Sequence, residues 1–255
     1  MQVKIYGLGW VGRSMKELFP DAWVHDPALG LIEDRVADVA IICVPTPLAE
    51  DGRLDCSIVE SVIRECREPL ILLRSTVMPG TSDRFQGKHI VCQPEYLGET
   101  VDHPLFDQGS RQFMILGGRQ DDRARIIELY QRVYNASIRI RQVTNYEAEV
   151  IKLSENRAIA FKVAQCQELY DSCVAAGLDY NTIREAVYGD DPRFNLLWTF
   201  VYPDARGFNS KCIPKDVYAW KAWAESIGYF PALTTAMLEE NARYLKAREL
   251  SAVTA

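Results

Sequence analysis

A cysteine, Cys212, lies between two lysines and four residues before an aspartate in the segment Gly207–Asp216. A cysteine acts as a nucleophile in its thiolate form, and neighbouring ammonium groups favour that form over the thiol. Pro214 favours a helix that begins just after Cys212, where the partial positive charge of a helix N-terminus also stabilises an anion. The segment therefore indicates a thiol suited to covalent redox catalysis. The alternative is a buried cysteine beside a turn, because unpaired cysteines are among the most buried residues.

The start of the sequence has the pattern of a dinucleotide-binding turn. A strand-like run, Val3–Tyr6, is followed directly by Gly7-Leu8-Gly9-Trp10-Val11-Gly12 and then by a helical pattern. In this motif the first glycine permits a tight turn, the second lets the backbone approach a pyrophosphate, and the third lets helix and strand pack closely. A second strand ends at Asp26, 19 positions after Gly7 (26 − 7), which suits an acid that binds the ribose hydroxyls. No arginine follows Asp26 immediately, so we expect NAD rather than NADP; a glycine-rich turn without a ligand is the alternative.

Composition limits the classes of protein that this sequence can belong to. The chain has 255 residues, of which 48% are apolar and 25% charged, as in a globular protein with one or two cores. A net charge of −6 argues against a nucleic-acid surface. The apolar runs are too short to span a membrane, and the first strand follows Met1 with no room for a signal peptide, so we expect a cytoplasmic protein. Seven cysteines without a CxxC pair fit a reducing compartment, and three scattered histidines predict no metal site.

Residues 1 to 143 alternate strand-like and helix-like segments, which predicts an α/β domain with a doubly wound, Rossmann-like, mostly parallel sheet. Ligands of such sheets bind beyond the C-terminal ends of the strands. Three polar segments fall at those ends and are expected to line a crevice for cofactor and substrate: Pro45-Thr46-Pro47, Ser75-Thr76 and Gln93-Pro94-Glu95. The further elements expected in this domain are Val39–Val44, Ile58–Ile63, Leu70–Leu73, Gly80–Phe85, Ile90–Cys92, Gln112–Leu116, Asp121–Tyr134 and Ile138–Arg141.

Residues 144 to 255 are predicted to form a second, all-helical domain. A helical pattern from 144 to 176 would span about 50 Å before Gly177 ends it, a length typical of a helix that bridges domains or forms a dimer spine. Shorter helices are expected at Tyr180–Val187, Asp216–Ser226 and Pro231–Leu250. On the long helix, Lys152 and Asn156 are four residues apart and share a face, where they could donate to a substrate or to a developing oxyanion. The alternative is that both are simply solvated.

Six motifs occur in the order found in the UDP-glucose/GDP-mannose dehydrogenase family, which this chain resembles from Met1 to about Lys246, including Asn241 in the last helix. The motifs are Gly7-x-Gly9-Trp10-Val11-Gly12, Val44-Pro45-Thr46-Pro47, Ser75-Thr76-Val77-Met78-Pro79-Gly80-Thr81, Pro94-Glu95-Tyr96-Leu97-x-Glu99, Lys152-x-x-x-Asn156 and Gly207-Phe208-x-x-x-Cys212-x-Pro214-Lys215-Asp216.

The resemblance implies an NAD-dependent oxidation of a primary alcohol to a carboxylate in two hydride transfers. Cys212 would attack the aldehyde formed first, and the resulting thiohemiacetal would become a thioester that water hydrolyses. Lys152 and Asn156 would stabilise the oxyanion. Asp216, together with Thr76, would position a water or relay a proton, and Glu95 would serve as acid and base in thioester hydrolysis.

The resemblance also implies binding residues and a homodimer built on the long helix. Arg193 resembles an arginine that reaches the substrate across the dimer interface. The residues implied at the cofactor are Gly7, Gly9, Trp10, Val11, Gly12, Asp26, Val44, Pro45, Thr46, Ser75, Thr76, Glu99 and Lys215. Those implied at the substrate are Glu95, Tyr96, Leu97, Lys152, Asn156, Arg193, Phe208 and Asn209.

The cysteine loop departs from the family pattern. Relatives usually have two glycines where Asn209 and Ser210 stand here, and Lys211 is unusual directly before the cysteine. Larger side chains in this loop should alter the pocket, because glycine is used where a ligand must approach the backbone closely. Full-length relatives also continue into a third domain that grips the nucleotide diphosphate, whereas this sequence ends at Ala255. The alcohol is therefore left open: a smaller alcohol, a free or nucleoside-linked sugar, or a nucleotide sugar held by a partner protein.

Two other functions fit parts of the sequence. A two-electron β-hydroxyacid dehydrogenase would share the dinucleotide motif, the helical domain and the Lys/Asn pair, but a single hydride transfer needs no thiol, so Cys212 favours the four-electron reaction. A catalytically inactive relative would bind NAD and a partner protein without turnover. The joint presence of Cys212, Lys152, Asn156, Asp216 and Glu95 argues against it.

Overall fold

The computed structural model describes residues 1–98, 107, 109 and 111–254. The chain forms two compact units, Met1–Lys152 and Leu153–Ala255, and the border between them falls inside one long helix, α4 (Asn145–Ala176). Lys152 thus belongs to the first unit, and Asn156, one turn later on the same helix, belongs to the second.

The first unit is built on a parallel five-stranded sheet with the strand order β2-β1-β3-β4-β5. The all-parallel pairing and the reversal of the strand order beside β1 confirm the predicted doubly wound, Rossmann-like α/β fold. Strands β3 to β5 are buried along their whole length, because helices cover both faces of the sheet. The strands are β1 (Val3–Tyr6), β2 (Trp23–His25), β3 (Val39–Ile42), β4 (Ile71–Leu73) and β5 (Ile90–Cys92).

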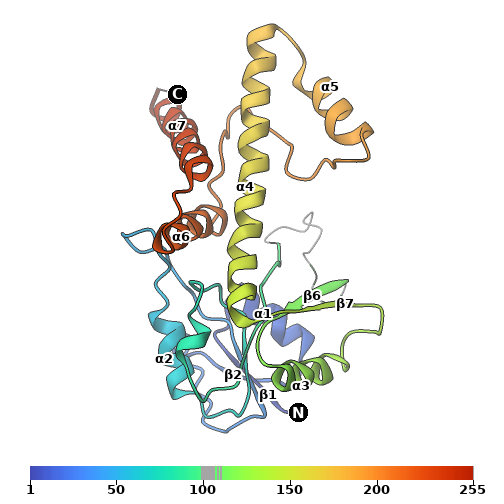
Figure 1. Cartoon of the computed structure of the whole chain (residues 1–255), viewed down its shortest axis with the longest axis vertical. Helices are drawn as coiled ribbons and strands as arrows, with labels where there is room; N and C mark the ends of the chain where they lie inside the picture. Colours follow the sequence, from blue (N-terminus) through green and yellow to red (C-terminus); the bar gives the residue numbers. More distant parts are fainter. Residues whose placement is uncertain (99–106, 108, 110, 255) are drawn as a thin grey trace. The chain divides into compact units, whose positions relative to one another are not determined.

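Three helices pack on this sheet: α1 (Trp10–Leu18), α2 (Ser57–Glu65) and α3 (Gln120–Tyr130). In Figure 1, α2 and α3 lie on opposite sides of strands β1 and β2. The main core forms on the side of α1 and α3, where Met15 and Leu129 join the strand residues Ile5, Ile41 and Leu72. A short 3₁₀ helix, Ser82–Arg84, follows β4 within the segment predicted at Gly80–Phe85.

Strands β6 (Phe113–Leu116) and β7 (Arg139–Gln142) form a separate parallel pair. The sequence predicted both strands as part of one continuous sheet, and on this point the structure differs. The residue after β6, Gly117, still bonds to the end of β5 through its amide and the carbonyl oxygen of Cys92 (2.8 Å).

The second unit consists of helices. Helix α4 has 32 residues and ends before Gly177, whose φ of 69° is a left-handed helix stop, as predicted. It is followed by α5 (Tyr180–Glu185), a π-helical turn (Ala186–Asp190), α6 (Ile213–Ser226) and α7 (Ala232–Thr254). One core joins Ala160 of α4 to Val217 of α6 and Leu238 of α7. Within the described part of the chain, no helix is both long and apolar enough to cross a membrane.

Candidate active site

The glycine turn after β1 has two glycines fixed by packing and one that faces open space. A Cβ on Gly7, which has a φ of 88°, would lie 2.9 Å from the carbonyl oxygen of Cys43, and one on Gly12 would lie 2.0 Å from the carbonyl oxygen of Gly7. A Cβ on Gly9 would meet no atom of the described residues within 4 Å. The turn is thus closed where strand and helix pack and open at Gly9, where the motif brings a pyrophosphate to the backbone.

Asp26, at the end of β2, is tied to this turn. One of its carboxylate oxygens, Oδ2, accepts a hydrogen bond from Leu8 N (2.7 Å), and no described residue donates to the other. An oxygen without a partner can accept a hydrogen bond from a ribose hydroxyl. Helix α1 begins after Gly9, and no side chain caps its first amides. The space, the uncapped amides and the acceptor all fit a bound dinucleotide.

The loops after β3 and β4 are bonded to each other at the same edge of the sheet. The Thr46 hydroxyl donates to the carbonyl oxygen of Thr76 (2.6 Å), and the Ser75 hydroxyl donates to the carbonyl oxygen of Val44 (2.7 Å). The structure therefore brings these four predicted cofactor residues together. Pro45 lies within the same loop, between Val44 and Thr46.

Glu95 is buried, and both of its carboxylate oxygens accept hydrogen bonds. Its Oε1 accepts from the amides of Tyr96 (2.7 Å) and Leu97 (2.6 Å) and from Arg111 Nη2 (3.0 Å), while Oε2 pairs with Arg74 Nη2. Sequence reasoning missed both arginines. A signal existed for Arg74, which directly precedes the Ser75-Thr76 motif at the end of a buried strand, and none for Arg111.

Lys152 lies near Tyr96 in the first unit. Its Nζ is 5.3 Å from the centroid of the Tyr96 ring, a cation–π distance. Two residues implied at the substrate, Tyr96 and Lys152, are thus neighbours. Glu99, implied at the cofactor, lies outside the described residues. The described residues also contain no group of three or more His, Cys, Asp or Glu that could hold a metal ion.

In the second unit, Asp216 connects the long helix to the helix that follows Cys212. Asn156 Nδ2 donates to Asp216 Oδ2 (2.5 Å), and Lys215 Nζ pairs with Oδ1 (2.6 Å). Asp216 is 1% exposed, so its charge is balanced by Lys215 rather than by water. Its amide bonds to the carbonyl oxygen of Cys212 (3.1 Å), which puts the carboxylate one helical turn after the cysteine.

Cys212 is the N-cap residue of α6, and Pro214 lies in the first helical turn, as predicted. It is the exposed one of the seven cysteines. The alternative interpretation of Cys212, a buried cysteine beside a turn, is therefore wrong. Burial raises the pKa of the Cys43 thiol to about 12 and that of Cys92 well above its ordinary value, so these two thiols are poor nucleophiles at neutral pH.

Asn241 of α7 holds the start of the cysteine loop. Its Oδ1 accepts from the Phe208 amide (2.7 Å), and its Nδ2 donates to the Phe208 carbonyl oxygen (3.0 Å). The approach requires glycine at 207, because a Cβ there would lie 2.7 Å from Asn241 Oδ1. Beyond this clamp, Asn209, Ser210 and Lys211 are exposed. The side chains that depart from the family pattern thus stand on the surface beside the cysteine.

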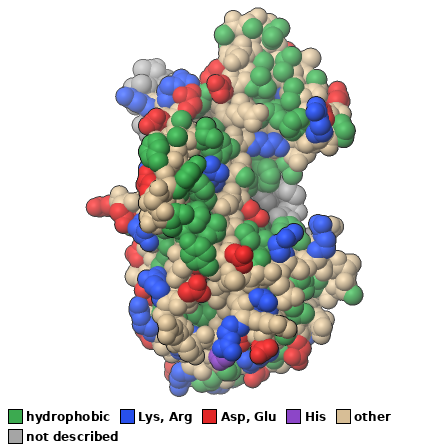
Figure 2. All heavy atoms as spheres, viewed as in Figure 1, with side chains coloured by type: hydrophobic (Ala, Val, Ile, Leu, Met, Phe, Trp, Pro, Cys, Tyr) green, Lys and Arg blue, Asp and Glu red, His purple; other side chains and the backbone are tan. Residues whose placement is uncertain are grey.

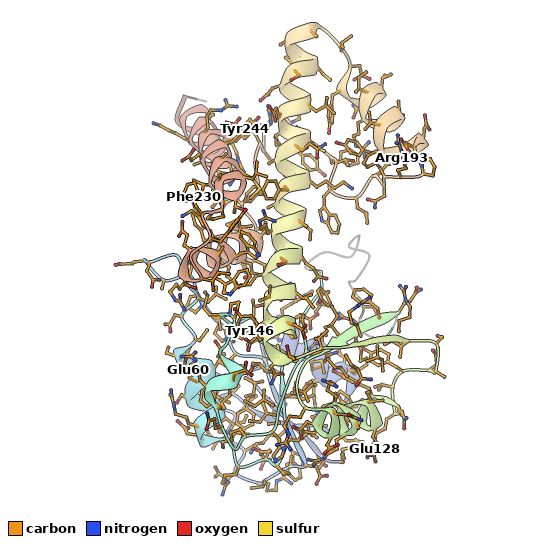
Figure 3. All side chains as sticks on the ribbon, in the orientation of Figure 1. Glu60, Glu128, Tyr146, Arg193, Phe230 and Tyr244 are labelled. Carbon is orange, nitrogen blue, oxygen red and sulfur yellow. The ribbon has the colours of Figure 1, made fainter. Side chains whose placement is uncertain are left out.

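Arg193 is exposed and pairs with Asp191 (2.6 Å). Figure 3 shows it on the α5 side of α4, whereas Phe230 and Tyr244, from the α6–α7 region, lie on the opposite side. Within one chain the second unit therefore does not bring Arg193 to the cysteine loop.

Comparison with known proteins matches both parts of the chain to one family. Residues 146–243 match the central domain of the UDP-glucose/GDP-mannose dehydrogenase family, and residues 32–137 match its NAD binding domain. The chain belongs to this family. NAD is the cofactor, in agreement with the open space at Gly9 and the acceptor at Asp26.

Several relatives of this chain are named as dehydrogenases of nucleotide sugars. The chain is 26% identical over 309 residues to a UDP-glucose 6-dehydrogenase of Haloferax volcanii, covering 94% of this chain and 69% of the relative. It is 29% identical to a UDP-glucose 6-dehydrogenase of Bacillus subtilis and to a GDP-mannose 6-dehydrogenase of Pseudomonas putida. The chain spans about half the length of these two relatives, 47% of the first and 51% of the second.

Solved structures share the fold. A UDP-glucose dehydrogenase from Pyrobaculum islandicum is similar with a TM-score of 0.78 and 22% identity over 95% of this chain and 68% of its own. A GDP-mannose dehydrogenase from Pseudomonas aeruginosa, solved as a ternary complex, is similar with a TM-score of 0.64 and 22% identity over 96% of this chain and 69% of its own.

Proposed function

We propose that this protein oxidises a primary alcohol of a sugar, nucleoside or nucleotide sugar to a carboxylate with NAD, through a covalent bond to Cys212. One observation carries the proposal. The exposed cysteine of the chain begins a helix whose first turn holds the buried Asp216, and Asp216 is bonded to Asn156 of the long helix. A thiol at a helix N-terminus beside a polar pair is suited to nucleophilic catalysis.

The chain's own residues would carry the chemistry on the carbon atom. When bound, NAD supplies the hydride acceptor, so one alcohol and one water yield one carboxylate, two NADH and three protons. The Cys212 thiolate attacks the aldehyde carbon and forms a C–S bond, and the carbonyl oxygen becomes an oxyanion. After the second oxidation the carbon is a thioester. Water then attacks it, the C–S bond breaks, and the thiolate is restored.

Lys152 and Asn156 are proposed to stabilise the oxyanion by charge and hydrogen bonding. Asp216 accepts a hydrogen bond from Asn156, which fixes the orientation of the amide. We also propose that Thr76 assists Asp216 in positioning water, and that Glu95 is the acid and base of thioester hydrolysis. The two arginines on Glu95 would set its position for that role.

The decisive experiment measures NADH released per molecule of alcohol over a panel of nucleotide sugars, nucleosides and free sugars. We expect two NADH per alcohol with the right substrate. The variant Cys212→Ala should lose acid formation by a factor of about a thousand or more while it still binds NAD. Cys173→Ala, which removes a buried thiol of the same unit, is the matched control and should retain activity.

Two other results of this experiment would each favour one of the alternative functions. One NADH per turnover, with an undiminished Cys212→Ala variant, would indicate a two-electron β-hydroxyacid dehydrogenase. NAD binding without turnover on any alcohol would indicate an inactive NAD-binding partner protein.

We further propose a homodimer built on the long helix α4, with the apolar segment at the α5 end of the second unit as part of its interface. Large apolar side chains are exposed in the segment after the π-helical turn, and Figure 2 shows hydrophobic side chains gathered over this end. They include Phe194 (52% exposed), Leu196, Leu197, Phe200 and Tyr202 (63%). Exposed apolar clusters of this kind mark protein interfaces. The same segment carries Arg193, the residue implied to reach a partner's substrate.

A further inference from the structure

Glu149, on α4 in the first unit, is a buried carboxylate whose hydrogen bonds all come from one loop. It is 2% exposed and lies three residues before Lys152. Its Oε2 accepts from the Gly80 amide (2.6 Å), and its Oε1 accepts from the Ser82 amide (2.9 Å) and the Ser82 hydroxyl (2.6 Å). Among the residues described, no basic side chain forms an ion pair with it.

A buried carboxylate without a cation is costly, because it loses hydration that no opposite charge replaces. Burial raises the pKa of Glu149, and the hydrogen bonds from Ser82 and Gly80 offset this only in part, so the pKa stays above its ordinary value. The charged form is therefore less favourable here than in the unfolded chain. A gain in folding stability therefore does not account for a glutamate at position 149. Its three hydrogen bonds to one loop indicate instead that it holds this loop in place.

The loop that Glu149 binds is the continuation of Ser75-Thr76. Met78, Pro79, Gly80 and Thr81 form a turn closed by a bond from Thr81 N to Met78 O (3.1 Å), and the φ of 88° at Gly80 matches the third position of a type II turn. The N-terminal part of this loop, at Ser75 and Thr76, is hydrogen-bonded to the loop after β3. Its C-terminal part, at Gly80 and Ser82, is hydrogen-bonded to Glu149.

We propose that Glu149 is a positioning residue that fixes the 75–82 loop against α4, and so sets Thr76 relative to Lys152 for binding of the cofactor and substrate. The inference rests on the proposed role of the 75–76 segment at the cofactor. Three donors converge on two oxygens, so only a group that accepts at both oxygens satisfies them. A carboxylate does so, whereas a glutamine would turn an NH₂ group toward a backbone N–H.

The test is the affinity for NAD, measured by calorimetric titration without an alcohol and well below the unfolding temperature. Glu149→Gln should raise the dissociation constant about tenfold, because a donor facing a donor releases one end of the loop. Ser82→Ala removes one of the three bonds and should act in the same direction by a smaller factor. The two changes together should act less than multiplicatively, because both break the same link.

Glu147→Gln is the control. Glu147 lies on the same helix but is exposed and bonds Thr144 instead of the loop, so the NAD affinity should be unchanged. The proposal is overturned if Glu149→Gln or Ser82→Ala lowers the unfolding temperature while NAD binds as in the wild type. Should Glu149→Gln not fold, Ser82→Ala decides alone. Binding is read without turnover, so a failure of the proposed alcohol oxidation would be seen separately.

Discussion

At the scale of single residues, the first unit holds its carboxylates in two different ways. Glu149 has hydrogen bonds and no cation, whereas Glu68 pairs with the buried Lys4 (2.6 Å) and accepts from the hydroxyl of Tyr6 (3.0 Å). Burial alone would raise the pKa of Glu68, but hydrogen bonds from Lys4, Cys66 and Tyr6 outweigh it and lower the pKa to about 2. Glu68 therefore stabilises β1 just before the glycine turn.

Glu68→Gln should lower the free energy of unfolding by about 3–5 kcal/mol, because Lys4 would remain buried without an anion. Urea denaturation measures this, with the exposed Glu65→Gln as a control that should change stability little. The pH dependence has a definite sign. The folded pKa lies below the ordinary value of 4.5, so the stabilisation is present above pH 4.5 and is lost as pH falls toward about 2. A variant as stable as the wild type at pH 7 would contradict this account.

Among the elements, the turn between β1 and α1 contains glycines that folding requires and one, Gly9, that only cofactor binding requires. Gly12 must be glycine because α1 packs against the carbonyl of Gly7, whereas Gly9 has an ordinary φ of −72° and open space around it. A motif of three glycines thus contains residues retained for different physical reasons. The sequence pattern does not distinguish them.

Gly9→Ala and Gly12→Ala should therefore fail in different ways. We expect Gly9→Ala to keep its stability within about 0.5 kcal/mol and to weaken NAD binding about tenfold or more, because the methyl group occupies the space of the pyrophosphate. Gly12→Ala should lose about 3 kcal/mol or more, because the helix must move away from the strand. Thermal unfolding and calorimetry with NAD measure both. Equal loss of stability in the two variants would refute the distinction.

At the scale of the whole molecule, the exposed apolar segment after the π-helical turn predicts self-association. Leu197→Asp should weaken the dimer by about 2 kcal/mol, roughly thirtyfold in the dissociation constant, because a charge would enter a desolvated interface. Light scattering across a concentration series measures the change. Leu233→Asp, at an exposed leucine of α7, is the matched control and should leave the dimer intact. A wild-type chain that stays monomeric at all concentrations would rule out the dimer.

The features that depend on local spacing could be predicted from the residues alone. The strand and glycine motif before α1, the length of α4 up to Gly177 and the start of α6 at Cys212 and Pro214 all follow from turn, cap and periodicity rules that act over a few residues. The order of the motifs also indicated the family and NAD.

The contacts between distant side chains could not be predicted in this way. Asn156 and Asp216 are 60 positions apart, and Ser82 and Glu149 are 67 apart. Arg74 and Arg111 reach Glu95 from different segments, and Cys212 is exposed while six other thiols are wholly or partly buried. Such contacts depend on how distant segments pack, because a hydrogen bond or a burial cost is set by neighbours in space, and residue types along the chain do not specify those neighbours.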